Sequence, residues 1–394
     1  MNVIKKIFFL IACSSSFSVF ALDENALQTA DSNTWNPLGG GYVSQFGIIT
    51  GNAFAISPKN ILFVAEISRS AYNELNVYTY TNNQWLLLNG TVNSDNNETV
   101  SLATDAQGVP YVGSMNFTDS NSTHVAVNTL ENNSWKSIFS SAKNESLEIS
   151  RYSLVVAKLK NNVTLPYLFY INDLNQTGNV IQFKNNHWVA VGNSFPISSI
   201  VPNTLNDLSL SIVLGPNQAP YIAWRDNNKI AVMALSSSKK WQLMGTEIPT
   251  SADHFSLAVN STGLPYIAYF ADTKTGYESV HVVLLNSKNA WQAVSNLSFF
   301  SAYQQQDNGE ESIHIALSTT HIPFVTFSDD DQAFTATLND QGKWALVGNS
   351  ASANDLGLVG ATFALDSKNN PYVLYEDLLR YDYVMTTMKE AASR

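Results

Sequence analysis

Hydrophobic and polar residues alternate along this chain in short runs that recur in a fixed order. Each unit contains a run such as Ser256-Leu-Ala-Val, a run such as Pro265-Tyr-Ile-Ala, a run such as Val280-His-Val-Val, and a run that opens with tryptophan. Asn, Asp, Gly and Ser separate the runs. Period-two alternation bounded by turn residues predicts β-strands, and helical periodicity of useful length is absent from the sequence after the N-terminal segment. Each unit therefore predicts four short strands.

Tryptophan marks the length of the unit. Seven of the eight tryptophans open the fourth run, and they stand at Trp35, Trp85, Trp135, Trp188, Trp241, Trp291 and Trp344. The spacings between neighbours are 50, 50, 53, 53, 50 and 53 residues. Large, rare residues do not recur so evenly by chance. Four strands every ~50 residues are typical of a β-propeller blade, since the coil of a solenoid is shorter.

A second anchor opens the second run of each unit. It is a proline followed by an aromatic residue at Pro110, Pro166, Pro220, Pro265, Pro323 and Pro371. The first unit has Leu62-Phe-Val in the same place, without the proline. Proline is tolerated at the first position of a strand, where the missing N–H donor does least harm. Seven anchors and seven tryptophans predict seven blades, and an eighth blade would require a repeat that the sequence does not contain.

The two ends of the repeat region are complementary. The chain begins with a fourth-type run at Trp35 and ends with a third-type run at Tyr383, and no tryptophan run follows. The N-terminal strand therefore completes the last blade, which leaves no sheet with an open edge. We predict an all-β protein, a seven-bladed β-propeller with four antiparallel strands per blade, closed by the strand at Trp35.

The combination of Gly-x-Pro-Tyr-Val-Ala with a following Trp-x-x-Val-Gly resembles the repeats of bacterial exported β-propeller proteins, which are often grouped with kelch-like or WD40-like propellers. The resemblance covers residues 35 to about 389. It implies the fold and little about function, because propellers host enzymes, lectins and scaffolds alike. The WD dipeptide, the sialidase Asp-box and the kelch double glycine within strands are missing from the sequence.

The N-terminal residues have the pattern of a secretory signal. Lys5 and Lys6 precede an apolar segment, and Val19-Phe-Ala21 matches a cleavage site. We expect residues 1–21 to be the signal peptide, 22–34 a short leader, 35–389 the propeller and 390–394 a tail. The protein is then exported, either secreted or periplasmic. An alternative is a lipoprotein anchored through Cys13, because Leu10-Ile-Ala-Cys13 resembles a lipobox.

The net charge and the cysteine content exclude several classes of binding partner and bond. The chain has 21 basic and 32 acidic residues; removing Lys5 and Lys6 leaves 19 against 32, a net charge of −13. An acidic surface repels nucleic acid and anionic membranes. The single cysteine, Cys13, lies in the signal, so the mature chain has no disulfide. We expect a monomer that has no membrane span and no cofactor and that binds no nucleic acid.

Aspartate recurs shortly after the second run of several units. Asp226, Asp329 and Asp377 follow their prolines by six residues, and Asp272 follows by seven. In a propeller the turns after the second strands share one face with the segments that link blades, so these acids would lie around the channel mouth. They could bind a cation or cap their own turns; one aspartate per turn favours capping. We predict no metal site.

Aromatic residues are also candidates for ligand binding. The longest link between blades, residues 296–310, contains Phe299, Phe300 and Tyr303 beside three glutamines, which suits a glycan or a peptide. The alternative is that these rings, and Phe195 in the link 193–206, pack the loop onto its blade. The seven repeated tryptophans occupy equivalent positions, which favours packing between blades over sugar stacking. Trp224 lies in a second run and is assigned to the core.

Catalytic motifs are lacking in the sequence. The six histidines have no metal-ligand spacing, and His281 and His314 lie in strand runs as core residues do. Gly-x-Ser-x-Gly is missing, and the Ser-x-x-Lys matches lie in polar loops without their companion motifs. We predict an exported, non-catalytic binding or scaffold protein that recognises a glycan or a protein through loops on one face. The alternative is an extracellular carbohydrate-active enzyme that uses acids at the channel mouth.

Overall fold

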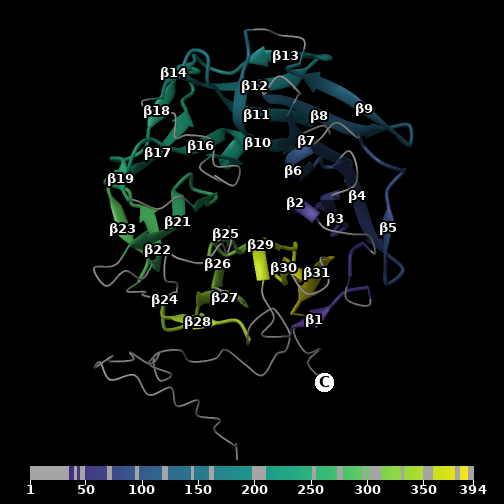
Figure 1. Ribbon diagram of the computed structural model, residues 1–394. Helices are drawn as coiled ribbons and strands as arrows, with labels where there is room; N and C mark the ends of the chain where they lie inside the picture. The colour runs from purple at the N-terminus through teal and green to yellow at the C-terminus, as the bar shows by residue number, and fades with distance from the viewer. Residues whose placement is uncertain are drawn as a thin grey trace, which may run out of the picture.

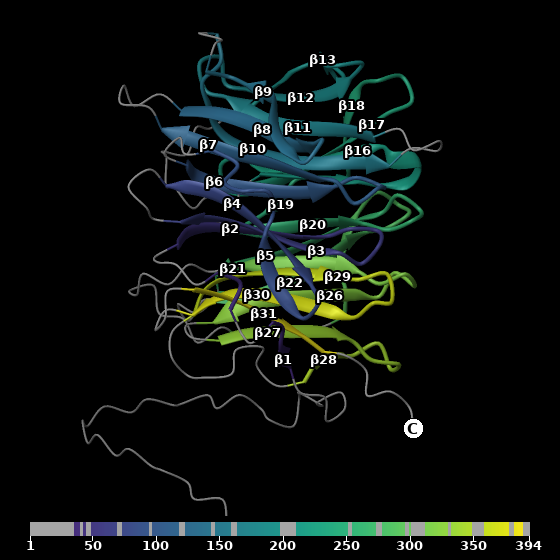
Figure 2. The same ribbon diagram turned by 90° about the vertical axis from the view of Figure 1, so that its right-hand side faces the viewer.

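The computed structural model shows seven antiparallel sheets arranged radially around a central axis (Figure 1). It describes residues 35–39, 42–44, 49–68, 73–93, 97–117, 123–142, 146–158, 164–197, 210–250, 254–272, 278–295, 299–300, 312–329, 332–348, 358–377 and 382–388. Seen from the side, the strands run from one face of the ring to the other (Figure 2). The predicted seven-bladed propeller is confirmed, and we number the blades 1 to 7 from residue 49.

Blades 1 to 6 each have four strands in sequence order from the axis outward, and blade 7 takes its fourth strand from the N-terminal end of the ring. The first strands are β2 (Ile49–Ile56), β6 (Asn97–Thr104), β10 (Ile149–Lys158), β15 (Leu210–Leu214), β20 (Phe255–Val259), β25 (Ile313–Leu317) and β29 (Leu358–Leu365). The second strands are β3 (Leu62–Ser68), β7 (Pro110–Phe117), β11 (Thr164–Asn172), β16 (Pro220–Arg225), β21 (Pro265–Asp272), β26 (Pro323–Asp329) and β30 (Pro371–Asp377). The anchor prolines thus stand at or near the start of the second strands.

In each blade, the fourth strand, at the outer edge, is shorter than the third strand. The third strands are β4 (Glu74–Thr81), β8 (Thr123–Glu131), β12 (Thr177–Lys184), β17 (Lys229–Leu235), β22 (Glu278–Leu285), β27 (Gln332–Leu338) and β31 (Asp382–Thr387). The fourth strands are β5 (Gln84–Leu87), β9 (Ser134–Ser140), β13 (His187–Ala190), β18 (Trp241–Leu243), β23 (Trp291–Ala293), β28 (Trp344–Leu346) and β1 (Asn36–Pro37).

Three blades carry a two-residue strand beyond the fourth. These strands, β14 (Phe195–Pro196), β19 (Ile248–Pro249) and β24 (Phe299–Phe300), pair with the beginning of the third strand of their own blade. The segment that leaves each of these blades is therefore fixed to the blade before it crosses to the next. Helical structure in the described residues is a single 3-10 turn at Pro216–Gln218. Within the same residues, no helix is long and apolar enough to cross a membrane.

Short polar residues close the turns between strands. Asp105 Oδ1 accepts the backbone N–H of Gln107 at 2.9 Å and of Val109 at 2.8 Å, and Gly108 takes a φ of 86°. The oxygen of Ser57, Asn260, Ser318 or Asp366 closes the equivalent turn of four other blades. Asn82-Asn83, Asn132-Asn133 and Asn185-Asn186 have two consecutive positive φ angles, as tight hairpins require. The abundance of Asn and Ser follows from these turns.

Consecutive blades bury apolar side chains against one another. On one face of blade 1, Leu62 and Val64 pack with Leu374 and Met385 of blade 7. On its other face, Ala65 and its neighbours pack with the first and second strands of blade 2. Each sheet therefore has two buried faces, one toward the preceding blade and one toward the next, and the core is a series of interfaces between blades.

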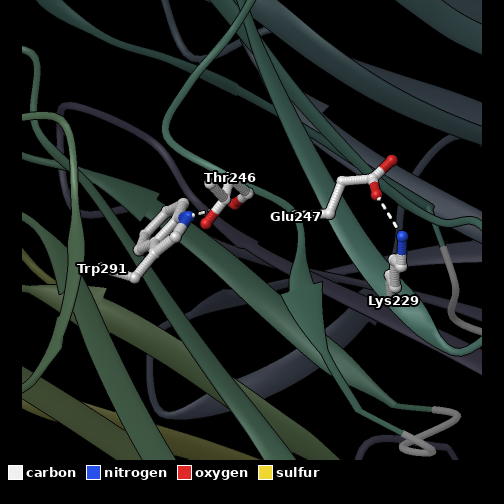
Figure 3. A network of polar contacts seen from close by, with 4 residues as sticks. All are labelled: Lys229, Thr246, Glu247 and Trp291. Carbon is white, nitrogen blue, oxygen red and sulfur yellow. Dashed lines mark hydrogen bonds and ion pairs between the residues drawn. The ribbon is translucent and has the colours of Figure 1, made fainter.

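The repeated tryptophans fasten neighbouring blades, as predicted. Six of them donate their indole Nε1–H to a backbone carbonyl of the preceding blade at 2.7–3.1 Å, and the pairs are Trp35–Val347, Trp135–Leu88, Trp188–Ile138, Trp241–Val191, Trp291–Thr246 and Trp344–Val294. Figure 3 shows the bond from Trp291 to Thr246 beside the ion pair of Lys229 and Glu247, at 2.8 Å. Trp85 is the exception, because its buried Nε1 has no hydrogen-bond partner among the described residues.

The glycine of the Trp-x-x-Val-Gly motif makes room for the next tryptophan. Gly192 has a φ of 72°, and a Cβ there would lie 2.7 Å from the Nε1 of Trp241. Gly245 has the same relation to Trp291, at 2.8 Å. A larger residue would meet both the indole ring and an unfavourable left-handed backbone. The motif therefore encodes the packing of one blade on the next.

The N-terminal strand closes the ring in blade 7. Strand β1 pairs with β31, with Asn36 opposite Thr387 and Pro37 opposite Thr386. Two further backbone bonds extend the contact, from Leu38 N to Met385 O and from Val43 N to Tyr383 O, both at 2.9 Å. Figure 1 shows the purple β1 beside the yellow β31. The predicted closure is confirmed, whereas the predicted signal peptide, leader, tail and Cys13 lie outside the described residues.

The tryptophan bonds can be tested with a matched pair of variants. We expect Trp241→Phe to lower the free energy of unfolding by about 1 kcal/mol more than Trp85→Phe does, because only Trp241 loses a hydrogen bond. Both changes remove similar carbon surface, so the difference isolates the bond. Urea denaturation of the two variants measures it. Equal losses in the two variants would show that the indole bonds do not contribute.

Candidate functional site

The four predicted aspartates lie at the same end of the second strands in four consecutive blades. Asp226 follows β16, and Asp272, Asp329 and Asp377 end β21, β26 and β30. The backbone N–H of Asp226 donates to Lys229 O at 2.9 Å and closes the turn. Asp377 Oδ2 accepts the hydroxyl of Tyr42 at 3.5 Å. The side chains of Asp272 and Asp329 lie outside the described residues. The backbone thus places one aspartate in each blade.

The loop aromatics are placed in part. Phe299 and Phe300 form β24, opposite Val280 and Ser279, but their side chains and the whole of Tyr303 lie outside the described residues. Phe195, in the equivalent strand of blade 3, is 7% exposed, and its ring centroid lies 4.9 Å from that of Trp224. For Phe195, packing of the loop onto the blades is confirmed. Trp224 is 3% exposed, as expected for a core residue.

The first strands, which lie nearest the axis, have an equivalent position that holds a serine in four of the seven blades. In each blade, one residue of the first strand pairs with the anchor at or near the start of the second strand. The position three residues before that first-strand residue holds Ala53, Ser101, Ser153, Ser211, Ser256, His314 or Thr362. Ser256 Oγ accepts the N–H of Ile315 in the next blade at 3.1 Å. His314 is the unusual member, because burial, followed by the nearby His254, lowers the pKa of its imidazole to about 4. Its Nε2 is buried and has no partner among the described residues.

His281, in β22, is a half-buried residue with a hydrogen-bond partner. His281 Nε2 lies 2.8 Å from Ser279 Oγ, and the ring stacks on Tyr269 at 5.4 Å. Burial lowers the pKa of His281. Within the described part of the chain, no three His, Cys, Asp or Glu side chains come together as metal ligands do.

A pocket lies between blades 1 and 2, and we call it the inter-blade pocket. Its volume is about 550 Å³, within the range of small-molecule sites. Its lining residues come from the end of blade 1 and from the second, third and fourth strands of blade 2. They are Val92, Asn93, Asn116, His124, Val125, Ala126, Asn128, Trp135, Ser137, Ser140 and Ala142.

Two substitutions in the repeat leave room for this pocket. Four residues after the anchor, five blades have a large aromatic residue, namely Tyr170, Trp224, Tyr269, Phe327 and Tyr375. Blade 2 has Ser114 there, fully buried and paired with Ala126 of the pocket lining. Asn128 occupies the third-strand position that holds Ile181, Met233 and Val283 in blades 3 to 5. A small side chain and a polar one thus replace core residues at one interface.

The pocket contains polar atoms without hydrogen-bond partners. Among the described residues, Asn116 Oδ1, His124 Nδ1 and Asn128 Nδ2 are buried and have none. Asn116 and His124 face each other across β7 and β8, and Asn128 is 5% exposed. An unpaired buried polar group costs about 1–3 kcal/mol, so such groups are ordinarily satisfied by protein, water or ligand. Their clustering in one cavity marks a site for a polar molecule.

The chemistry of the lining suits recognition. The lining side chains are amides, an imidazole, hydroxyls, an indole and aliphatic groups, and none is a carboxylate, an amine or a guanidinium. Hydrolysis of a glycoside ordinarily needs a pair of carboxyl groups. The indole of Trp135 is held in place by its bond to Leu88 O at 3.0 Å. The pocket therefore offers a fixed aromatic wall and several hydrogen-bonding groups.

Sequence reasoning did not identify this pocket. Trp135 was assigned to packing, which is correct for its Nε1, but Asn116, His124 and Asn128 were not singled out as a group. The available signal is a departure from the repeat, because Ser114 stands where five units have an aromatic ring. Glu66 is the other departure at this position, and it is 1% exposed between Asn52 and Asn76 in the register of blade 1.

Comparison with known proteins supports the fold alone. No family model and no curated protein matches the chain. A protein from Lactobacillus plantarum is 10% identical over 82% of this chain and 94% of its own, with a TM-score of 0.50. The Aleuria aurantia lectin in complex with Fucalpha1-6GlcNAc is 12% identical over 77% and 97%, with a TM-score of 0.47. The α-L-arabinofuranosidase Arb93A of Fusarium graminearum is 10% identical over 91% and 96%, with a TM-score of 0.45.

Proposed function

We propose that the chain is an exported, non-catalytic binding protein and that the inter-blade pocket is its ligand site. One observation carries the proposal: Asn116, His124 and Asn128 place three buried polar atoms, which have no hydrogen-bond partner in the described part of the chain, in a cavity of about 550 Å³. A folded chain retains such atoms at a cost in stability, and a bound molecule that pairs with them removes that cost. Export is proposed from the signal-like residues around Lys5, Lys6 and Ala21.

Of the two partner classes, a glycan fits this pocket better than a protein. Protein interfaces bury roughly 800 Å² on each partner and are mostly broad surfaces, whereas a small cavity encloses one compact group. A terminal sugar of a glycan is such a group. Phe299 and Phe300 lie in β24 of blade 5, away from the pocket, so in this proposal they and Tyr303, which follows them in sequence, form a separate contact with the partner. The repeat pattern that resembles bacterial exported propellers is consistent with this role.

The site is tested by restoring the core residue of the other blades. We expect Asn128→Ile to abolish glycan binding and to raise the free energy of unfolding by about 1 kcal/mol, because an apolar residue replaces a buried unpartnered amide. Ser114→Tyr, which restores an aromatic residue at its position, should also block the pocket. A glycan array and urea denaturation give the two readouts.

Thr129 supplies the matched control, because it neighbours Asn128 but points to the opposite face of the sheet. Its hydroxyl donates to Pro110 O at 3.0 Å. We expect Thr129→Val to lower the free energy of unfolding by about 1 kcal/mol and to leave binding intact. If Asn128→Ile and Ser114→Tyr both bind glycans as the unaltered protein does, the pocket is not the ligand site.

A further inference from the structure

We infer that the occupant of the inter-blade pocket is an uncharged saccharide unit, and that charged sugars and other ions are excluded. This inference rests on the proposed function, because it specifies the ligand of the same site. Three properties of the lining carry it: its lack of charge, its mixture of donors and acceptors, and its apolar wall.

The lining has no permanently charged side chain that could balance a charge on the ligand. Its eleven residues include no Asp, Glu, Lys or Arg, although the protein as a whole has a net charge of −11. A charged group that leaves water without a counter-charge loses hydration that the pocket does not replace. Lys136, next to Trp135, is 60% exposed and pairs with Glu131 of the same hairpin. An acidic sugar, a sugar phosphate or an amino sugar would therefore enter at a large cost.

The hydrogen-bonding groups of the pocket are complementary to a ligand that has both donors and acceptors. Asn116 Oδ1 is a free acceptor and Asn128 Nδ2 a free donor, and His124 Nδ1 adds a ring nitrogen. Ser137 and Ser140 contribute hydroxyls, and Asn93 a further amide. A sugar hydroxyl both donates and accepts, so it can pair with any of them. A carboxylate only accepts and an ammonium only donates, so either one, in place of a hydroxyl, can pair with only one kind of group at that position.

The remaining lining is apolar and would contact the C–H surface of a sugar ring. Trp135, Val92, Ala126 and Ala142 form this part, whereas the side chain of Val125 is buried on the opposite face of the sheet. Because the indole Nε1 already bonds to Leu88 O, Trp135 adds carbon surface to the pocket. A purely polar small molecule would leave that surface in contact with water, whereas a pyranose has hydroxyl edges and C–H faces. The ligand is thus amphipathic on the scale of one ring.

The inference is tested with matched pairs of sugars that differ in one charge. After an array has identified a neutral glycan that binds, calorimetry compares the terminal neutral sugar with its uronic acid, its 6-phosphate and its 2-amino form. We expect each charged analogue to bind at least tenfold more weakly than the neutral sugar. Binding of the neutral sugar should be lost in Asn128→Ile and retained in Thr129→Val.

The outcomes separate the two proposals. If a charged analogue binds as tightly as the neutral sugar, and Asn128→Ile abolishes this binding, the pocket is the ligand site but the exclusion of charge is wrong. If no glycan of either kind binds, or if binding is unchanged in both Asn128→Ile and Ser114→Tyr, the proposed function fails and the inference fails with it.

Discussion

A chain that lacks residues 35–41 is expected to lose its seventh blade before any other. Without β1, the edge of β31 is unpaired, and the buried Tyr383 and Met385 lose part of their cover. The bond from Trp35 to Val347 O is also lost, so blade 7 loses one of its contacts with blade 6 as well. Trp35 is half-buried, so its removal adds part of the about 3–5 kcal/mol that loss of a fully buried tryptophan costs. We therefore expect the free energy of unfolding to fall by at least about 4 kcal/mol.

Amide hydrogen exchange identifies where the ring opens. In the shortened protein, the amides of β30 and β31 should exchange at least tenfold faster, while those of β16 and β17 in blade 4 keep their protection. Removal of residues 22–34, which precede the closing strand, should change neither region. Uniformly faster exchange in all seven blades would instead mean that the ring unfolds as one unit and that closure is not a local event.

The second large effect concerns acid stability and His314. Burial lowers the pKa of this imidazole from 6.5 to about 4. Between pH 4 and pH 6.5, His314 is therefore protonated in the unfolded chain and neutral in the folded chain. The contribution of neutral His314 is therefore complete above about pH 6.5 and is lost as the pH falls toward 4. A difference of 2.5 pKa units corresponds to about 3 kcal/mol. We expect His314→Ser, which restores the residue of four other blades, to remove this dependence.

Urea denaturation at pH 7 and at pH 4 tests the His314 prediction. The loss of stability between the two pH values should be about 3 kcal/mol smaller in His314→Ser than in the unaltered protein. His187→Ser, which replaces an exposed histidine on the hairpin of blade 3, is the matched control variant. If His314→Ser and the unaltered protein lose equal stability in acid, the imidazole does not govern acid unfolding.

Much of the fold could be predicted from the sequence because each feature of the repeat has one physical role. The even spacing of Trp35, Trp135 and their equivalents reflects an indole bond that six of the seven blades make with the blade before them. The last unit has no tryptophan run after Tyr383, and the fourth-type run at Trp35 takes that place in the sheet. Strands β14, β19 and β24 were not predicted, because two residues are too short to show alternation.

The pocket was harder to predict because it arises where blade 2 lacks the large apolar side chains that other blades have at the same positions. Ser114 and Asn128 fit a period-two pattern as well as Tyr170 and Ile181 do, so the strand prediction is the same with either pair. Only the register of the strands shows that Ser114 and Asn128 lie on the same face of blade 2, toward blade 1. The aspartates illustrate the reverse case: Asp226 and Asp377 recur visibly in sequence, yet the described contacts of each are with its own turn or with Tyr42.

The closing sheet imposes an order on biosynthesis. Strand β1 is the first strand of the ring to leave the ribosome, and its partner β31 is the last, so β1 waits unpaired while the strands of six blades are made. Blades 1 to 6 are each continuous in the chain and can form their sheets in turn. Blade 7 assembles only when synthesis of the whole ring is complete. A premature stop anywhere before residue 382 therefore leaves a ring that cannot close.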